Sequence, residues 1–71
     1  MQLVLNGQAR EFPQLAPGAS LQDLIADLGL KGDRVAIEHN GNIIGRSEWS
    51  SAALAEGDRL EVVHFVGGGR L

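Results

Sequence analysis

The segment EGDRLEVVHFVGGG, residues 56–69, joins an acidic turn, an alternating strand and a run of three glycines. The residues at 55–58 predict a tight turn, because glycine flanked by acidic residues favours chain reversal. Residues 59–66 read RLEVVHFV and predict a strand, in which successive side chains point to opposite faces. Three glycines lose much backbone freedom on ordering and so add no stability to a fold. The segment therefore predicts a final strand followed by glycines that serve another purpose.

Two further stretches carry hairpin signals. Residues 2–12 read strand, turn, strand, with Asn6-Gly7 at the turn. Residues 34–39 form a second alternating run, and Asn40-Gly41 separates it from a short apolar stretch at 42–45. An Asn-Gly pair favours a type I′ turn, which needs a positive φ at both central positions. Together with the last strand, these stretches predict five strands.

One helix is predicted over SLQDLIADLG, residues 20–29. Ser20 and Asp23 have the spacing of a capping box, and Gly29 is placed to end the helix in the left-handed conformation. One apolar stripe recurs at helical spacing, formed by Leu21, Leu24, Ile25 and Leu28. A short helix with a narrow stripe is stable only against another element. The order β-β-α-β-β-β therefore predicts an α+β domain with the helix across one face of a mixed sheet.

The composition restricts the function classes. Apolar residues make up 44% and charged residues 21% of the 71 residues, which is typical of a globular domain. The chain has no cysteine, so disulfides, a thiol nucleophile and a thiolate metal site are excluded. It shows neither a secretory signal nor an apolar run of the roughly 20 residues that a membrane helix needs, and we expect a cytoplasmic protein without membrane partners. A net charge of −3 argues against nucleic-acid binding.

The alternation of the last strand predicts an exposed apolar patch. If Leu60 and Val62 face the helix, Val63 and Phe65 point to the other face of the sheet, which no second helix covers. Val4 of the first strand is expected to join them. Exposed apolar patches usually mark partner docking. The alternative is that the loop around Trp49, a residue expected to cover an edge of the core, folds over the patch.

The charged residues form no catalytic or metal-ligating set. No spacing of Asp and Glu supports an acid–base pair, and His39 and His64 lie in different predicted elements with no cysteine near them. We therefore expect no metal site and no enzyme activity. Glu56, Asp58 and Glu61 are expected to be exposed and to steer a basic partner surface toward the last strand, an effect that salt weakens.

These segments together resemble the ThiS branch of the ThiS/MoaD sulfur carriers, which are ubiquitin-like proteins. The likeness covers the opening LNG, the helix SLQDLIADLGL, the middle VAIEHNGNIIGRSEW and the end EGDRLEVVHFVGGG. The last segment is the most specific, because hairpins and amphipathic helices are common. The resemblance implies a β-grasp domain at residues 1–66, with a mixed sheet of about five strands and one main helix across one face. Residues 67–71 would form a flexible, glycine-rich tail.

The resemblance also implies a use for the glycines. In this family a ThiF-like adenylyltransferase uses ATP to adenylate the C-terminal glycine carboxylate, here that of Gly69. Sulfur from a cysteine desulfurase or another persulfide donor then replaces AMP and leaves a thiocarboxylate, which a ThiG-like thiazole synthase uses to build the thiazole ring of thiamin. Gly67 and Gly68 would thread the tail into narrow partner clefts, because they lack Cβ atoms. The chain itself would bind no cofactor.

Arg70-Leu71 depart from the family, whose mature carriers end in glycine. An acyl adenylate cannot form at an internal peptide bond, so we expect a processing protease to hydrolyse the Gly69-Arg70 bond. Cleavage after Gly68 is the alternative, although relatives ending in HFVGGG favour Gly69. Another origin for Arg70-Leu71 is the cloning of the gene.

Two other functions remain open at this stage. A carrier for another sulfur pathway, or a ubiquitin-like protein modifier, would use the same chemistry at Gly69 with different partners. A non-catalytic interaction module would instead keep Arg70-Leu71 and bind through Val63, Phe65 and a sheet edge. The function of such a module would survive removal of the tail.

Overall fold

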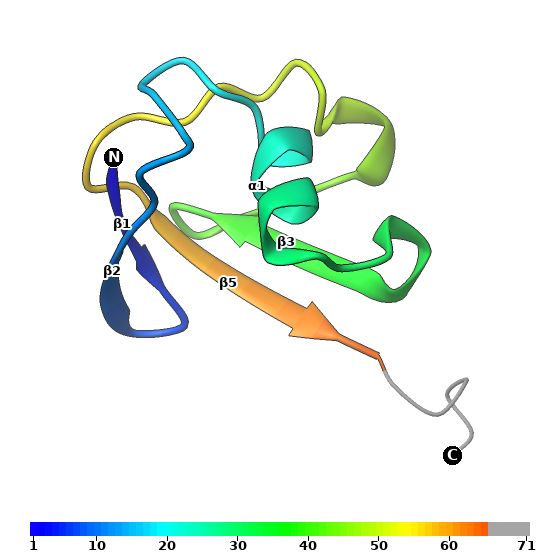
Figure 1. The fold of residues 1–71 in the computed structure, drawn as a ribbon. Coiled ribbons are helices and arrows are strands. Elements are labelled where there is room, and N and C mark those ends of the chain that lie inside the picture. The colour runs from blue at the N-terminus through cyan, green and yellow to red at the C-terminus, as the bar shows by residue number, and fades with distance from the viewer. Residues whose placement is uncertain (66–71) are drawn as a thin grey trace.

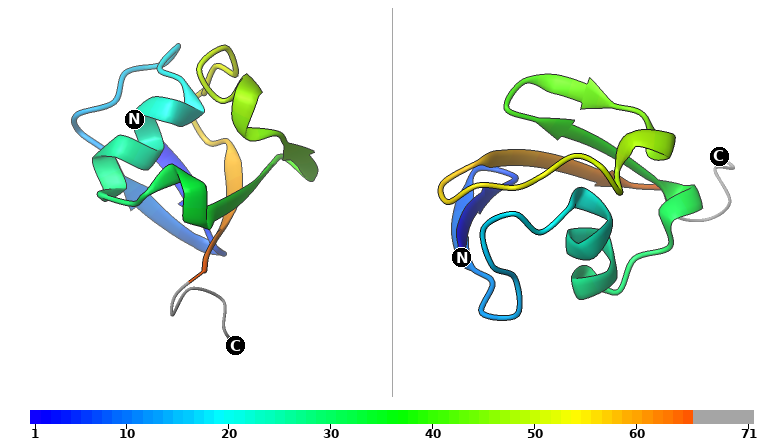
Figure 2. Two further views of the ribbon diagram at one scale, coloured as in Figure 1. Left: turned by 90° about the vertical axis from the view of Figure 1, so that its right-hand side faces the viewer. Right: turned by 90° about the horizontal axis from the view of Figure 1, so that it is seen from above.

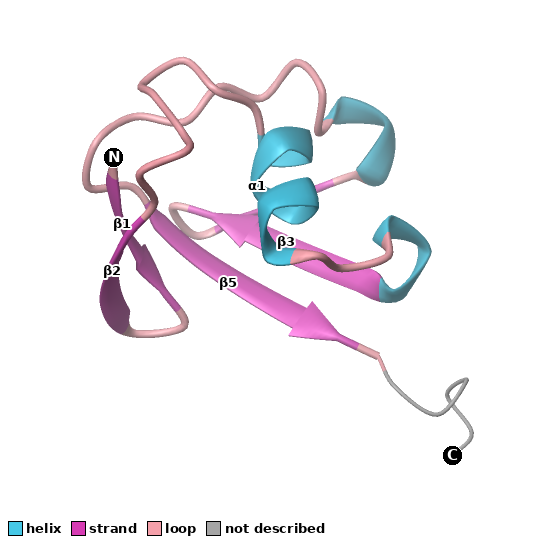
Figure 3. Cartoon of the chain, viewed as in Figure 1, coloured by secondary structure: helices cyan, strands magenta, loops and turns pink. Residues whose placement is uncertain are grey.

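Five strands form one mixed sheet in the order β2-β1-β5-β3-β4 in the computed structural model, which describes residues 1–65 (Figures 1 and 3). The strands are β1 (Gln2–Leu5), β2 (Gln8–Glu11), β3 (Val35–His39), β4 (Asn42–Ile44) and β5 (Arg59–His64). One α-helix, α1 (Leu21–Leu28), and two 3₁₀ turns, η1 (Gly32–Arg34) and η2 (Arg46–Glu48), complete the described chain. The predicted order of strands and helix is confirmed.

Strand β5 lies in the middle of the sheet. It runs parallel to β1, with Leu5 opposite Leu60, and antiparallel to β3, with Val35 opposite His64. The strand ends at His64, although the backbone N–H of Phe65 still donates to the Arg34 carbonyl at 2.7 Å. The predicted strand end at residue 66 and the predicted tail at 67–71 lie outside the described residues.

Both predicted hairpins form, and their turns have the expected backbone. The φ angles are 50° and 82° at Asn6 and Gly7, and 51° and 90° at Asn40 and Gly41. A type I′ turn needs positive φ at both central residues, which asparagine and glycine tolerate best. The two Asn-Gly pairs therefore fix the positions of the β1–β2 and β3–β4 hairpins.

The helix begins and ends where the sequence predicts. The Ser20 hydroxyl accepts from the Asp23 backbone N–H at 3.1 Å, and the Asp23 carboxylate accepts from the Ser20 N–H at 2.9 Å, which completes the capping box. Gly29 ends the helix with a φ of 73°. The right-hand view of Figure 2 shows α1 on one side of β3 and β5. No helix of the described residues is both long enough and apolar enough to span a bilayer.

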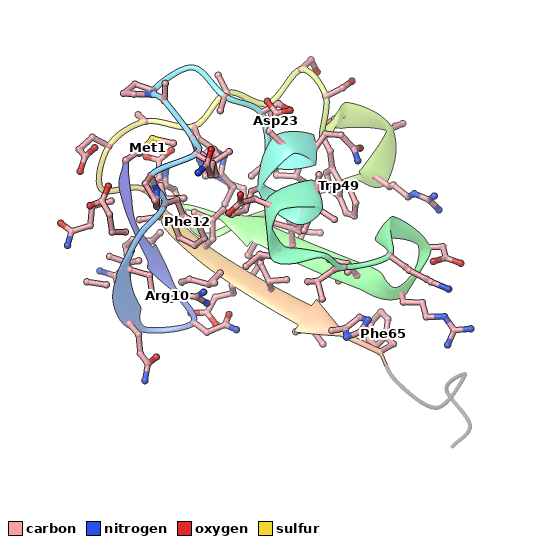
Figure 4. The ribbon with its side chains drawn as sticks, in the orientation of Figure 1. Met1, Arg10, Phe12, Asp23, Trp49 and Phe65 are labelled. Atoms are coloured by element: carbon pink, nitrogen blue, oxygen red, sulfur yellow. The ribbon has the colours of Figure 1, made fainter. Side chains whose placement is uncertain are left out.

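The core fills the space between the sheet and α1. The sheet contributes Leu3, Leu5, Ile37 and Leu60, and the helix contributes Leu21, Leu24 and Ile25. Trp49 follows η2 and is fully buried in this core, where its Nε1 donates to the Ile44 carbonyl at 3.1 Å (Figure 4). The prediction that Trp49 only covers a core edge is therefore wrong, because its ring is part of the core.

Candidate functional site

The outer face of the sheet, opposite α1, carries the apolar residues that the sequence places there. Along β5, Leu60 is buried and Val62 packs against the core, whereas the alternate residues face outward. Val63 is 53% exposed and Phe65 is 51% exposed. The loop around Trp49 does not cover them, since Trp49 packs on the other face, and that alternative is wrong. The docking role of Val63 and Phe65 remains a prediction.

The register of β3 and β4 adds a third apolar residue to this face. Ala36 lies directly opposite Val63, and Glu38 lies between Glu61 on β5 and Ile43 on β4. Ile43 is 79% exposed, more than Val63 and Phe65. Together these residues surround a shallow hollow of about 110 Å³ whose lining is Ala36, Ile37, Glu38, Ile43, Glu61 and Val63.

The sequence did not identify Ile43 as part of the face. The stretch Asn42-Ile43-Ile44 is uniformly apolar after its first residue, so alternation alone cannot tell which isoleucine points outward. The signal was the two-residue turn at Asn40-Gly41. It fixes the pairing of Glu38 with Ile43, and the outward direction of Glu38 then places Ile43 on the same face.

Val4 does not join the patch around Val63. It lies opposite Arg59, and its side chain is half-buried. Arg59 and Val63 are four residues apart, which is about 13 Å along a strand. Val4 is therefore on the outer face near the start of β5, whereas Val63 and Phe65 are at the end from which the chain continues to residue 66.

Asp58 is not the exposed carboxylate that we expected. Its Oδ2 accepts from His39 Nε2 at 2.7 Å and from the Ala55 N–H at 2.9 Å, and its Oδ1 accepts from Asn40 Nδ2 at 3.2 Å. Its side chain is only 16% exposed. Asp58 thus joins the β3–β4 turn to the turn before β5, and is occupied in the fold. Glu61, by contrast, is exposed.

Glu56 also has a structural contact, although it is exposed. Its Oε2 accepts from the backbone N–H of Gln2 at 3.0 Å, and the Gly57 N–H donates to the Gln2 carbonyl at 2.8 Å. The turn at 55–58 therefore holds the start of β1 as well as the β3–β4 turn. Of the three carboxylates expected to steer a partner, only Glu61 lies on the outer face beside the apolar residues.

The surroundings of Asp58 change its proton affinity. Partial burial on its own raises the pKa, but the hydrogen bonds from His39, Ala55 and Asn40, together with the charge on His39, outweigh burial and lower the pKa of Asp58 below its ordinary value of 3.8. An ionised carboxylate only accepts hydrogen bonds, so His39 Nε2 carries the shared proton. This arrangement is structural, because it lies between two turns.

The glycines that carry the predicted chemistry lie outside the described residues. Gly67, Gly68 and Gly69 follow β5 in the sequence, as do Arg70-Leu71. Among residues 1–65, no three His, Cys, Asp or Glu side chains gather closely enough to hold a metal ion. His39 is engaged with Asp58, and His64 is an exposed residue at the end of β5.

Comparison with known families decides what kind of chain this is. The model of the ThiS family matches residues 3–69, nearly the whole chain. The chain belongs to the ThiS family. The match covers both hairpins, the helix and β5, and it extends through the three glycines without including Arg70-Leu71. The resemblance seen in the sequence is therefore confirmed.

Relatives of similar length support this assignment. The chain is 42% identical to the sulfur carrier protein ThiS of Bacillus subtilis over 67 residues, which cover 94% of this chain and 98% of the relative. The crystal structure of the thiamine biosynthesis protein ThiS from Geobacter metallireducens superposes with a TM-score of 0.81 at 27% identity, covering 97% of this chain and 100% of the other. The fold is thus the β-grasp fold of ThiS proteins.

Two longer relatives of this chain are thiazole synthases. The chain is 38% identical to that of Paramagnetospirillum magneticum over 69 residues, and 36% identical to that of Magnetococcus marinus over 70 residues. These matches cover 97% and 99% of this chain but only 20% and 21% of the relatives. The chain therefore spans about a fifth of the length of these thiazole synthases.

Proposed function

We propose that this chain is a sulfur carrier for thiamin biosynthesis, acting in the cytoplasm, and that the carboxylate of Gly69 carries the sulfur. The observation that carries the proposal is the extent of the family match, which runs to residue 69 and stops before Arg70-Leu71. A likeness that included only the folded domain would leave the glycines unexplained. The name of the Bacillus subtilis relative, sulfur carrier protein ThiS, gives the class of function.

The proposed chemistry takes place at the chain end. A ThiF-like adenylyltransferase would join the Gly69 carboxylate to the AMP part of ATP and release pyrophosphate. The outer sulfur of a persulfide on a cysteine desulfurase or another donor would then displace AMP and form an acyl disulfide. A thiol such as that of free cysteine would reduce this disulfide, becoming a disulfide itself, and release the thiocarboxylate. Glycines at 67 and 68 suit this role because a backbone without Cβ atoms enters narrow clefts. In this scheme the chain is a protein substrate, and its partners are the enzymes.

Arg70-Leu71 must be removed before this chemistry, since an internal peptide carbonyl cannot be adenylated. We propose that a protease hydrolyses the Gly69-Arg70 bond, with the bond after Gly68 as the alternative. Hydrolysis adds one water across the peptide bond and gives the free carboxylate that the activating enzyme needs.

Thiazole synthase is the proposed acceptor of the sulfur. Two relatives with this name contain a segment that matches nearly the whole of this chain, so a carrier-like domain and the rest of a thiazole synthase occur in one polypeptide. Val63 and Phe65 would dock both this acceptor and the activating enzyme. Their position at the end of β5 suits that role, because a partner seated there lies beside the start of the tail.

Reconstituted thiazole formation tests the proposal. The reaction would contain the adenylyltransferase, ATP, a cysteine desulfurase, cysteine, thiazole synthase and its small-molecule substrates. We expect product with the chain ending at Gly69, and none with the full chain or with a control ending at Gly68. Equal product from every form, or from a mixture without the chain, would contradict the proposal. Product only with the form ending at Gly68 would move the sulfur-carrying residue to Gly68.

A further inference from the structure

The outer face of β5 presents a basic, an acidic and an apolar side chain in a fixed order. Arg59, Glu61 and Val63 are alternate residues, so they follow one another on this face at intervals of about 7 Å. A cation lies nearest the turn, a carboxylate follows, and an apolar residue lies nearest the exit of the chain. All three are exposed. A surface that fits this face must therefore offer complementary groups in the matching order.

The carboxylate of Glu61 has an unfavourable neighbour. Glu38 lies directly opposite it on β3, and both side chains are exposed on the same face. Residues directly opposite on antiparallel strands have Cβ atoms about 5 Å apart, and like charges in such a pair destabilise a sheet. Two exposed carboxylates at this separation attract a cation more strongly than either one alone.

No cation of the described chain forms an ion pair with either carboxylate. Within residues 1–65, the ion pairs join Met1 to Glu11 and His39 to Asp58, and neither includes Glu38 or Glu61. Arg59 borders the same part of the face, but its guanidinium lies within 4.0 Å of neither carboxylate. The pair is therefore open to a positive group from another molecule.

Apolar residues lie beside the carboxylate pair. Ile43 of β4 lies opposite Glu38 of β3, and Val63 comes two residues after Glu61 on β5. Ile43 and Val63 therefore line the same hollow as the two carboxylates. Ile43 is 79% exposed, an unusual environment for an isoleucine that nothing in the described chain covers. A side chain entering the hollow would contact hydrocarbon on one side and carboxylate oxygens on the other.

We propose that Glu38 and Glu61, with Ile43 and Val63, form a recognition site for one lysine or arginine of a partner protein and for an apolar side chain beside it. The cation would lie between the two carboxylates, and the apolar side chain would pack on Ile43 and Val63. This inference rests on the proposed function, because the partner is the adenylyltransferase that activates the C-terminus. The inference adds which groups of that enzyme the chain recognises, namely one cation and one apolar side chain.

The position of the recognition site suits this partner. Gly69 is six residues beyond Val63, so the C-terminal carboxylate reaches at most about 22 Å from Val63 even when the chain is fully extended. One domain of an enzyme that binds the recognition site is therefore large enough to bind the C-terminal carboxylate as well. The charge of the site also gives it an attraction that acts before contact and that salt weakens.

Binding of the adenylyltransferase to the chain ending at Gly69 tests the recognition site. The double variant Glu38→Gln with Glu61→Gln removes both charges while leaving the size of the side chains unchanged. Ile43→Ala removes the apolar contact. Asp27→Asn is the matched control, since it removes one exposed carboxylate on α1, on the opposite side of the sheet. The affinity of each form is measured by calorimetry at low and high salt, and its stability by denaturant unfolding.

We expect the double variant to bind at least about tenfold more weakly at low salt, because close charge pairs at interfaces contribute strongly to affinity. Its affinity should also depend less on salt, and the variant should be no less stable than the wild type. Ile43→Ala should bind about tenfold more weakly, and Asp27→Asn should bind like the wild type. Unchanged affinity and salt dependence in the double variant would overturn the recognition site.

Two further outcomes separate this inference from the proposed function. If the wild type acquires sulfur and the variants bind as tightly as it does, only the recognition site fails. If no form binds the enzyme or acquires sulfur, the proposed function fails as well. Self-association of the wild type that Ile43→Ala abolishes, with enzyme binding unchanged, would assign the face to a second copy of the chain and overturn the inference.

Discussion

The side chain of Asn6 pairs with the backbone of Val62 as another strand would. Its Oδ1 accepts from the Val62 N–H at 2.8 Å, and its Nδ2 donates to the Val62 carbonyl at 3.2 Å. Asn40 has a related role on the other side of β5, where its Oδ1 accepts from the Arg59 N–H at 2.9 Å. The asparagines of both hairpin turns therefore hold the strand that leads to the C-terminus.

Replacing Asn6 by alanine should loosen β5 beside Val62. The variant loses both hydrogen bonds and places alanine at a positive φ, so we expect a loss of about 1–3 kcal/mol in the free energy of unfolding. Amide hydrogen exchange at Val62 should become faster, while exchange at Arg59 should stay unchanged. Asn6→Asp keeps the acceptor oxygen and should lose less stability. Wild-type stability in Asn6→Ala would show that the pairing contributes nothing.

Asp58 connects the β3–β4 turn to the turn before β5, and acid should weaken this connection. Because the folded pKa of Asp58 is below its ordinary value of 3.8, ionised Asp58 stabilises the fold. This contribution is complete above the unfolded pKa, near pH 4, and is lost as the pH falls through the lowered folded pKa. The free energy of unfolding should therefore fall below about pH 4 in the wild type.

Asp58→Asn is the variant that isolates this contribution, because it keeps the size of the side chain without its charge. We expect it to be less stable than the wild type at pH 7, with a smaller difference at pH 3. Denaturant unfolding across this range measures both. A stability difference that stays constant with pH would contradict the assignment, as would one that grows in acid.

Trp49→Phe should destabilise the core. The ring is fully buried, and phenylalanine lacks both the volume of indole and the N–H that donates to Ile44. Losses of about 2–4 kcal/mol in the free energy of unfolding are typical of such changes. Circular dichroism follows unfolding in the variant, since Trp49 is the only tryptophan of the chain. A change below about 0.5 kcal/mol would mean that Trp49 only covers an edge after all.

Phe65→Ala should weaken binding to the activating enzyme with little effect on the fold. The side chain is 51% exposed, so its removal costs little packing, whereas an anchor at an interface contributes about 1–3 kcal/mol to binding. Gln22→Ala on the exposed face of α1 is the control. Wild-type affinity in Phe65→Ala, or gross unfolding of the variant, would remove Phe65 from the docking surface.

Local signals in the sequence predicted most of the fold. The capping box at Ser20 and Asp23 and the two Asn-Gly turns act within a few residues, so their geometry depends little on the rest of the chain. Alternation along β5 likewise predicted which side Val63 faces, since the period of a strand is two. These features were accessible because each is set by backbone chemistry nearby.

Features that depend on contacts across the sheet were not predicted. Asp58 and His39 are 19 residues apart, and only the pairing of β3 with β5 brings them together. The carboxylate pair of Glu38 and Glu61 likewise depends on that register. Trp49 was misplaced for a similar reason, because the path of the loop after β4 carries its ring into the core.

The central claim is that Gly69 carries sulfur once Arg70-Leu71 are gone, and intact-protein mass spectrometry tests it most directly. The full chain and the form ending at Gly69 would each be incubated with ATP, the adenylyltransferase, a cysteine desulfurase and cysteine. We predict a mass increase equal to the exchange of one oxygen for sulfur in the form ending at Gly69, and none in the full chain. An unchanged mass in both forms, although both bind the enzyme equally well, would contradict the claim.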